Sequence, residues 1–183
     1  MRRKSDISSI LEGCIRGDAK CQRQLYELYC EEAFGICRRY ARNDQEAEDM
    51  LQSAFVNIYR FLHKFEGRGS FSSWIRKVIV HNCLVYLKQH RHMYRNIEIS
   101  DQHYATEVAD SAFSHLEKED LLKMVQQLPD GYREVFNLFA IEGYSHREIA
   151  AKLGIAESTS RSQLTKARRL LRNLIIKSKN LVL

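Results

Sequence analysis

The sequence predicts an all-α fold of two small helical domains joined by a flexible linker, and three observations indicate this. The 183 residues include one proline and eight glycines, too few chain breakers for a many-turned β-sandwich. Apolar residues recur at helical spacing in two separate stretches. The segment between them lacks sustained helical periodicity and reverses the sign of the net charge. We therefore expect domains at residues 1–95 and 117–183 and a linker at residues 96–116.

The first domain is predicted to hold three helices around one apolar core. A first helix is indicated by apolar residues at near-helical spacing: Leu25, Leu28, Tyr29, Ile36 and Tyr40. A second helix is expected at about residues 44–65 and a third at about residues 72–90. The glycine-containing residues 66–70 separate them. We expect Trp74, at the start of the third helix, to be a core residue.

Five cysteines stand in this first domain, at positions 14, 21, 30, 37 and 83, and none belongs to a CxxC pair. Cys14 and Cys21 are seven residues apart, as are Cys30 and Cys37, and this spacing predicts that each pair shares one helix face. We expect the cysteines to be small buried apolar side chains in a reducing compartment. Metal binding or redox use is the alternative.

The second domain begins with a helix indicated by Leu121, Val125 and Leu128. Pro129 follows, and its missing N–H suits the first turn of the next helix, which Gly143 ends. Ser145 and Glu148 have the spacing of a capping box at the start of a short third helix. Gly154 predicts a tight turn after it.

A last helix is expected to begin near Ser158, a plausible N-cap. Its inward positions are predicted to be Ser160, Leu164, Ala167 and Leu171. Its outward positions are predicted to be Arg161, Ser162, Gln163, Thr165, Lys166, Arg168, Arg169 and Arg172. Two helices joined by a glycine turn form a helix-turn-helix, whose second helix enters the DNA major groove.

The chemistry of this last helix favours nucleic acid. Residues 161–179 contain seven Lys or Arg and no Asp or Glu. Arg161, Gln163 and Lys166 lie near the helix start, and these residue types recognise guanine and adenine edges. The arginines further along suit phosphates, which fix register without reading sequence: Arg168, Arg169 and Arg172. The alternative is a solvated basic face on a structural hairpin.

The helix expected at residues 44–65 begins with four carboxylates, on Asp44, Glu46, Glu48 and Asp49. Negative charge at a helix start is stabilised by the helix dipole, so a purely local role is one interpretation. The other is a docking face for a basic partner helix, with Asp49, Gln52 and Phe55 as contacts. No nucleophile, paired histidine or metal-ligand set accompanies the carboxylates, so we expect no enzyme activity, no cofactor and no small-molecule substrate.

Residues 61–74 interleave aromatic rings, glycines and cations. Single-stranded nucleic acids are bound by aromatic stacking beside positive charge, at about 1–3 kcal/mol per stacked base. This pattern predicts a nucleic-acid loop. The alternative is that Phe65, Phe71 and Trp74 are core residues on either side of a turn.

Two motif blocks, FEGRGSFSSWIRKVIVHN and LPDGYREVFNLFAIEGYSHREIAAKLGI, occur in order between the acidic helix and the basic helix. With them the chain resembles the extracytoplasmic-function group of the sigma-70 family of bacterial RNA polymerase sigma factors, over residues 20–175. The resemblance implies a non-enzymatic subunit that directs core polymerase to −35/−10 promoters and aids opening of the duplex. It implies contacts with the polymerase β′ clamp and β flap, and a linker that threads the polymerase's RNA path. It also implies an anti-sigma factor, which in the family is often membrane-bound.

The resemblance assigns residues to three sites. The β′ clamp contacts would be Glu48, Asp49, Gln52 and Phe55. The −10 element would meet Phe61, Lys64, Phe65, Gly67, Arg68 and His81. The −35 element would meet Arg161, Ser162, Gln163, Thr165, Lys166, Arg168 and Arg169. Two positions depart from the family pattern: His81 replaces a usual asparagine, and Ser160 replaces a usual β-branched apolar residue, which predicts weaker packing there.

The chain's formal charge of +6 divides unevenly, as +4 for residues 1–90, −2 for residues 91–116 and +4 for residues 117–183. A polyanionic partner is permitted by this balance rather than required. No apolar stretch reaches the roughly 18 residues of a membrane helix, and no secretion signal is visible at the start, so we expect a cytoplasmic location. The alternative function is a helix-turn-helix regulator that binds duplex DNA without joining polymerase, which predicts a sensor or dimerisation module in residues 1–95.

Overall fold

The computed structural model describes residues 2–94 and 118–180, so the linker predicted at residues 96–116 lies outside the described residues. Within those described ranges the chain forms helices and turns and no strand, which confirms the all-α class. The chain divides into two compact units, Met1–Tyr86 and Leu87–Leu183. Among the described residues, none of the helices combines the length and the hydropathy of a membrane-spanning segment.

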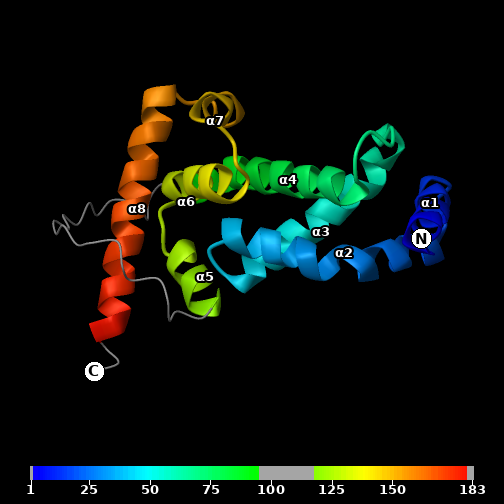
Figure 1. Ribbon diagram of the computed structural model, residues 1–183, viewed down its shortest axis with the longest axis horizontal. Coiled ribbons are helices and arrows are strands. Elements are labelled where there is room, and N and C mark those ends of the chain that lie inside the picture. The colour runs from blue at the N-terminus through cyan, green and yellow to red at the C-terminus, as the bar shows by residue number, and fades with distance from the viewer. Residues whose placement is uncertain (1, 95–117, 181–183) are drawn as a thin grey trace. The chain divides into compact units, whose positions relative to one another are not determined.

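The first unit contains the helices of Figure 1 from the N-terminus to the middle of α4. They are α1 (Arg2–Ile15), α2 (Ala19–Tyr40), α3 (Asp44–Phe61), the 3-10 turn η1 (Leu62–Lys64) and α4 (Phe71–Tyr94), of which residues up to Tyr86 belong to this unit. The helix predicted at residues 44–65 therefore ends earlier, and η1 replaces its last turn. Sequence periodicity did not predict α1, which packs against α2 and η1.

Polar caps begin the two central helices, α2 and α3, which pack side by side. The Asp18 carboxylate accepts from the backbone N–H of Lys20 at 2.8 Å, and the Asn43 side chain accepts from that of Glu46 at 2.8 Å. Fully buried apolar side chains of this unit include Leu25, Ile36, Met50, Ile58, Ile75 and Ile79. Leu28 was predicted to face this core, but it is 60% exposed.

The cysteines of the described residues are free thiols. Cys14, Cys37 and Cys83 are buried, as the buried-apolar interpretation expects, whereas Cys21 and Cys30 are half-buried. Cys14 lies on α1 and Cys21 on α2, so the prediction that they share one helix face is wrong. Burial raises the pKa of the Cys14 thiol to about 11. Cys83 donates to Cys37 Sγ at 3.9 Å, and this bond together with burial raises the pKa of Cys83. Both shifts keep the thiols protonated at neutral pH, which disfavours reactivity.

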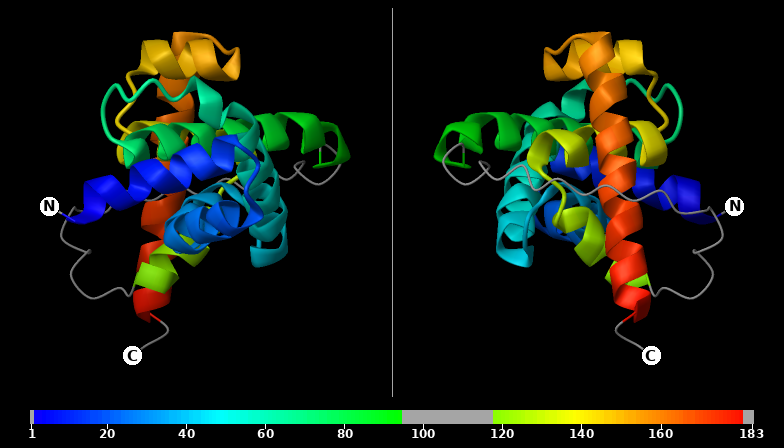
Figure 2. Two further views of the ribbon diagram at one scale, coloured as in Figure 1. Left: turned by 90° about the vertical axis from the view of Figure 1, so that its right-hand side faces the viewer. Right: turned by 90° about the vertical axis from the view of Figure 1, so that its left-hand side faces the viewer.

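In the second unit, the shorter helices pack against the long helix at the C-terminal end of the described chain. The elements of this unit are α5 (Lys118–Gln126), α6 (Asp130–Phe136), the π-helical turn η2 (Asn137–Ile141), α7 (His146–Leu153) and α8 (Glu157–Asn180). Figure 2 shows α7 crossing α8 near the first turns of α8. The buried apolar residues of these elements are Met124, Leu128, Val135, Leu138, Ile149, Leu164, Ala167 and Ile175.

A buried arginine ties α5 to α6. Arg133 is 1% exposed, and its guanidinium donates to the carbonyl oxygens of Gln126 at 3.1 Å and Leu128 at 2.8 Å. It also donates to Asp130 Oδ1 at 2.5 Å. Pro129 was predicted to lie in the first turn of α6, but it is the N-cap of that helix. The connection between α5 and α6 is therefore held by side-chain bonds to backbone carbonyls.

Candidate nucleic-acid interface

The turn between α7 and α8 has the local geometry that its sequence predicts. The Ser145 hydroxyl accepts from the Glu148 N–H at 3.3 Å, and the Glu148 carboxylate accepts from the Ser145 N–H at 2.8 Å, which completes the capping box. Hydrogen bonds from the Ser145 hydroxyl and N–H lower the pKa of Glu148. Gly154 has φ 68° and ends α7 in the left-handed region, where glycine meets no Cβ penalty. This confirms a helix-turn-helix.

The N-terminus of α8 differs from the prediction. The helix begins at Glu157, so Ser158 lies in its first turn and is not the N-cap. The face toward the unit's core carries Ser160, Leu164 and Ala167, all buried, and half-buried Leu171. The exposed positions are Arg161, Ser162, Thr165, Lys166, Arg168, Arg169 and Arg172. The exposed face therefore carries five cations and two hydroxyls, which suits a DNA groove.

Gln163 is the exception on this helix, because it was predicted to point outward and is half-buried. A Cβ built on Gly131 of α6 would lie 3.1 Å from Gln163 Nε2, so the amide packs against that glycine. Its Oε1 atom is buried and has no hydrogen-bond partner. Side-chain periodicity alone cannot show this, since the space is created by a glycine 32 residues earlier in the chain.

Three cations on the exposed face of α8 are held in defined positions. Arg161 pairs with Glu157 one turn earlier, with both side chains largely exposed. The Lys166 ammonium lies 5.8 Å from the centre of the Tyr132 ring, and the Arg168 guanidinium lies 5.7 Å from that of Phe139. Such cation–π contacts contribute about 0.5–1 kcal/mol at exposed sites. They orient the cations while leaving their N–H donors available.

The end of α3 and the loop after it present one exposed ring and exposed cations beside an aromatic cluster. Phe61 is 36% exposed, and the Lys64 ammonium lies 5.0 Å from the centre of its ring. Gly67 and Gly69 have φ values of 74° and 88°, which only glycine adopts readily. Between them, Arg68 is exposed and pairs with Glu66 at 2.9 Å. The loop is therefore exposed, and it adjoins a group of packed aromatic rings.

These packed rings form an aromatic cluster at the start of α4. The Phe65 ring centre lies 5.2 Å from that of Phe71 and 5.7 Å from that of Trp74. Phe71 is buried, as the core interpretation of the loop expects, whereas Phe65 and Trp74 are half-buried. The prediction that Trp74 is a core residue is therefore wrong, since part of its ring reaches the surface. The cluster leaves apolar ring area available beside the exposed loop.

His81 and Asn82 follow on α4 and have opposite environments. His81 is exposed, as a contact residue would be. Asn82 is 4% exposed and donates to the Met50 carbonyl of α3 at 3.1 Å. Its Oδ1 accepts from Ser53 Oγ at 3.1 Å and from Asn57 Nδ2 at 2.6 Å. Asn82 thus fixes α4, and with it the aromatic cluster, against α3.

Replacing Asn82 with alanine should destabilise the first unit by roughly 1–3 kcal/mol, because Ser53 and Asn57 lose their acceptor inside the protein. The chain has one tryptophan, Trp74, and it lies in this unit, so denaturant unfolding followed by tryptophan fluorescence measures the loss. The neighbouring His81→Ala variant removes an exposed side chain and should change stability by less than about 0.5 kcal/mol. Equal stabilities of the two variants would contradict the assignment.

The carboxylates at the start of α3 divide into two groups. Asp44 pairs with Arg38 at 2.8 Å, and Glu46 is buried and accepts from the Arg42 N–H at 2.6 Å. The local interpretation therefore accounts for these two. Glu48 and Asp49 are exposed, and Asp49 accepts from the Tyr86 hydroxyl at 3.4 Å. These two remain available to a partner.

Gln52, one turn further along α3, is exposed on the same helix as Glu48 and Asp49. Phe55 was predicted to be a partner contact as well, but it is 4% exposed. Its ring centre lies 4.6 Å from that of Tyr26 and 6.0 Å from that of Tyr59. Phe55 is therefore a core residue, and the acidic face of α3 consists of Glu48, Asp49 and Gln52.

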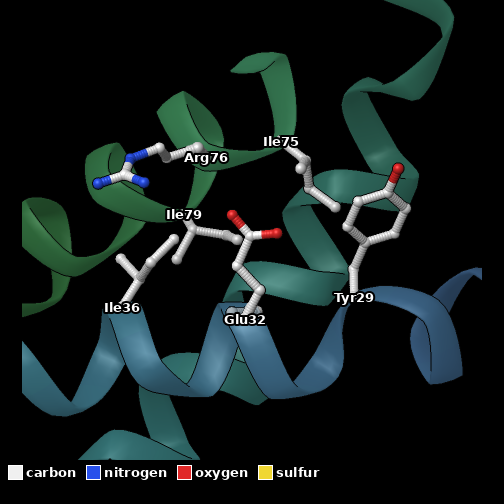
Figure 3. Close-up of a pocket in the computed structure, with 7 residues that line it drawn as sticks. Tyr29, Glu32, Ile36, Ile75, Arg76 and Ile79 are labelled. Carbon is white, nitrogen blue, oxygen red and sulfur yellow. The ribbon is translucent and has the colours of Figure 1, made fainter. Parts of the chain in front are cut away.

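Figure 3 shows a shallow depression between α2 and α4, which is too small to hold even a water molecule. Its floor is formed by Ile36, Ile75 and Ile79, and Glu32 and Arg76 stand at its rim. An apolar floor with two rim charges lacks the convergent polar groups of a catalytic site. Among the described residues, no group of three or more His, Cys, Asp or Glu is placed to hold a metal ion.

Comparison with known proteins agrees with this geometry. Residues 25–93 match the family model "Sigma-70 region 2", and residues 118–171 match "Sigma-70, region 4". The chain is 25% identical over 170 residues to the RNA polymerase sigma-H factor of Pseudomonas aeruginosa, covering 87% of this chain and 88% of that protein. It is 24% identical over 155 residues to the ECF RNA polymerase sigma factor SigM of Bacillus subtilis, covering 82% and 93%.

A solved structure shares the fold. The sigma factor RpoE of Bartonella quintana, determined in complex with the anti-sigma factor NepR, matches at a TM-score of 0.52 and 22% identity, covering 84% of this chain and 95% of that one. The region 2 match occupies the stretch where a free-standing regulator would need a sensor or dimerisation module. Both matches together place the acidic face, the loop and the helix-turn-helix in one family, and the chain belongs to the extracytoplasmic-function sigma factors of the sigma-70 family.

Proposed function

We propose that this sigma factor binds core RNA polymerase through the first unit and directs it to promoters with a −35 and a −10 element. One observation carries the proposal: an exposed acidic helix face, an aromatic–glycine loop and a cationic recognition helix occur in a single chain. The first suits a basic partner surface, and the other two suit single-stranded and duplex DNA. A chain that only bound duplex DNA would need neither of the first two.

The −35 element would be read by the N-terminal half of α8. Arg161 and Lys166 are exposed there and can donate to guanine edges in the major groove. Ser162 and Thr165 are exposed beside them, and Arg168 and Arg169 follow as phosphate contacts. Gln163 is removed from the set of base readers, because its amide packs against Gly131.

The −10 element would be met by the loop after α3. Extruding a base from the duplex costs a few kcal/mol, so the protein must offset this by stacking and pocket contacts. Phe61 and half-buried Phe65 supply ring area, and Lys64 and Arg68 supply charge for the backbone. Gly67 lets the backbone approach the strand closely, and exposed His81 on α4 would add a polar contact.

The remaining partners follow from membership of the family. The acidic face of α3 would contact the β′ clamp, and the second unit would contact the β flap. Residues 96–116 would link domains 1–95 and 117–183 and would thread the RNA path of the polymerase. The polymerase would supply the catalytic activity. The complex would act in the cytoplasm. An anti-sigma factor, in this family often membrane-bound, would hold the chain inactive, and the structure of the Bartonella quintana factor bound to NepR supports such a partner.

Binding of core polymerase tests the first step. The double variant Asp49→Ala with Gln52→Ala should bind core polymerase about tenfold or more weakly, because it removes two adjacent polar contacts from the centre of the acidic face. The matched control, Gln24→Ala with Glu27→Ala, also removes one carboxamide and one carboxylate at the same spacing, from an exposed part of α2. Fluorescence anisotropy of labelled sigma factor measures both, and equal affinities would exclude the acidic face as the polymerase contact.

A further inference from the structure

A partly buried side-chain hydrogen bond joins the recognition helix α8 to α7. Ser160 of α8 is fully buried, and its Oγ lies 2.9 Å from Nδ1 of His146, the first residue of α7. The two residues are 14 positions apart and lie on opposite sides of the Gly154 turn. Ser160 immediately precedes Arg161, the first of the proposed base contacts. The bond therefore joins α7 to the part of α8 that would meet the −35 bases.

The Ser160 hydroxyl differs from those of Ser162 and Thr165 on the same helix. Ser162 Oγ donates to the Thr159 carbonyl at 3.0 Å, and Thr165 Oγ1 donates to the Arg161 carbonyl at 3.1 Å, so both bond to their own helix. The Ser160 hydroxyl bonds across to a second helix. A buried hydroxyl that lost this partner would be left without a hydrogen bond, which is unfavourable, so the bond restricts how α8 can rotate against α7.

The histidine ring is itself held in place. Its centre lies 4.6 Å from the centre of the Phe139 ring, and the two rings are nearly parallel, at 22°. The Arg168 guanidinium lies 5.7 Å from the centre of the same Phe139 ring. Phe139 therefore supports both the histidine that meets Ser160 and a cation of the DNA-facing side of α8.

We propose that His146 is a positioning residue for promoter recognition: its hydrogen bond to Ser160 sets the rotation of α8, and so the direction in which Arg161 and Lys166 approach the −35 bases. The inference rests on the proposed function and deepens it. A shift in rotation changes hydrogen-bond geometry at base edges, where alignment is demanding, far more than contact with phosphates. Loss of the bond should therefore reduce discrimination between −35 sequences more than overall binding.

A double-mutant cycle tests the proposal in reconstituted holoenzyme. The variants are His146→Phe, which keeps a ring to stack on Phe139, Ser160→Ala, and the two combined. Each is assayed on a promoter selected by the wild-type holoenzyme from a random −35 library, and on the same promoter with a scrambled −35 element. The measured quantity is the ratio of the two run-off yields, together with the melting temperature of each variant.

Each single variant should lower the ratio by about five- to tenfold, within the cost of one unpaired buried polar group. The double variant should lower it no further, because both changes break the same bond. Its melting temperature should recover toward the wild-type value, because no buried polar group is then left unpaired. His146→Asn, which keeps a polar atom near the Nδ1 position, should retain more of the ratio than His146→Phe.

Ser178→Ala is the matched control, since the Ser178 hydroxyl donates to the Ile175 carbonyl of its own helix, and its ratio should stay at the wild-type value. A ratio unchanged in both single variants, or losses that multiply in the double variant, would overturn the positioning role. If His146→Phe does not fold, Ser160→Ala still decides the matter, because it removes one buried atom. Failure of the wild-type holoenzyme to start transcription at any selected promoter would instead overturn the proposed function, and the inference with it.

Discussion

Replacing Arg133 with alanine should cost the second unit about 3–5 kcal/mol, the range observed when one partner of a buried ion pair is removed. The guanidinium is 1% exposed, and its removal takes a cation from Asp130 and donors from the carbonyl oxygens of Gln126 and Leu128. A loss of this size is a large fraction of the stability of a small domain. The helix-turn-helix should then be unfolded in a substantial part of the population at 37 °C.

The two units allow this loss to be assigned. Trp74 reports on the first unit, whereas far-UV circular dichroism reports on the helices of both. The Arg133→Ala variant should shift the circular dichroism transition and leave the tryptophan fluorescence transition in place. Arg147→Ala, which removes an exposed arginine from α7, should change neither by more than about 0.5 kcal/mol. A fluorescence transition that moves as far as the circular dichroism transition would contradict this account of Arg133.

Replacing both Arg161 and Lys166 with alanine should weaken binding to a matched −35 element by roughly 1–3 kcal/mol for each residue. The two side chains are five residues apart on α8, and both are exposed on its DNA-facing side. If they contact base edges, the loss should be confined to the matched sequence and should almost vanish on a scrambled one. Affinities of the holoenzyme for the two duplexes, measured at one fixed salt concentration, make the comparison.

Arg169→Ala is the counterpart of this variant, because Arg169 is exposed further along α8 and is proposed to meet a phosphate. It should weaken binding to both duplexes alike and reduce the salt dependence by about one phosphate contact. A double Arg161 and Lys166 variant that behaved in the same way would show that α8 contacts only the backbone with these residues. The assignment of base readers would then be wrong, although the helix would still bind DNA.

Local signals in the sequence predicted much of the second unit. The capping box of Ser145 and Glu148 and the left-handed Gly154 depend on residues within one turn of each other, so their geometry could be read before any packing was known. The exposed cations of α8 followed from helical periodicity alone. The N-cap of α8 was predicted two residues too late, at Ser158, because serine favours that position, whereas the helix begins at Glu157 directly after Ala156.

Contacts between distant segments account for what the sequence did not show. Phe55 was predicted to lie on an exposed face, but Tyr26 of α2 packs against its ring. Gln163 was predicted to point outward, but its amide packs in the space beside Gly131. Asn82 lies at helical spacing from the buried Ile75 and Ile79, which is the available sequence signal, but its three partners lie 25 to 32 residues earlier. Ser160 was predicted to pack weakly, whereas it is buried against His146.

The most direct test of the central claim is a run-off transcription assay with purified core RNA polymerase. A linear DNA library with random −35 and −10 elements supplies the templates. We expect core polymerase alone to give only background, and the addition of this chain to give discrete transcripts from templates that share a −35 and a −10 motif. Failure of the chain to bind core polymerase, or binding without any promoter-dependent transcript, would contradict that claim.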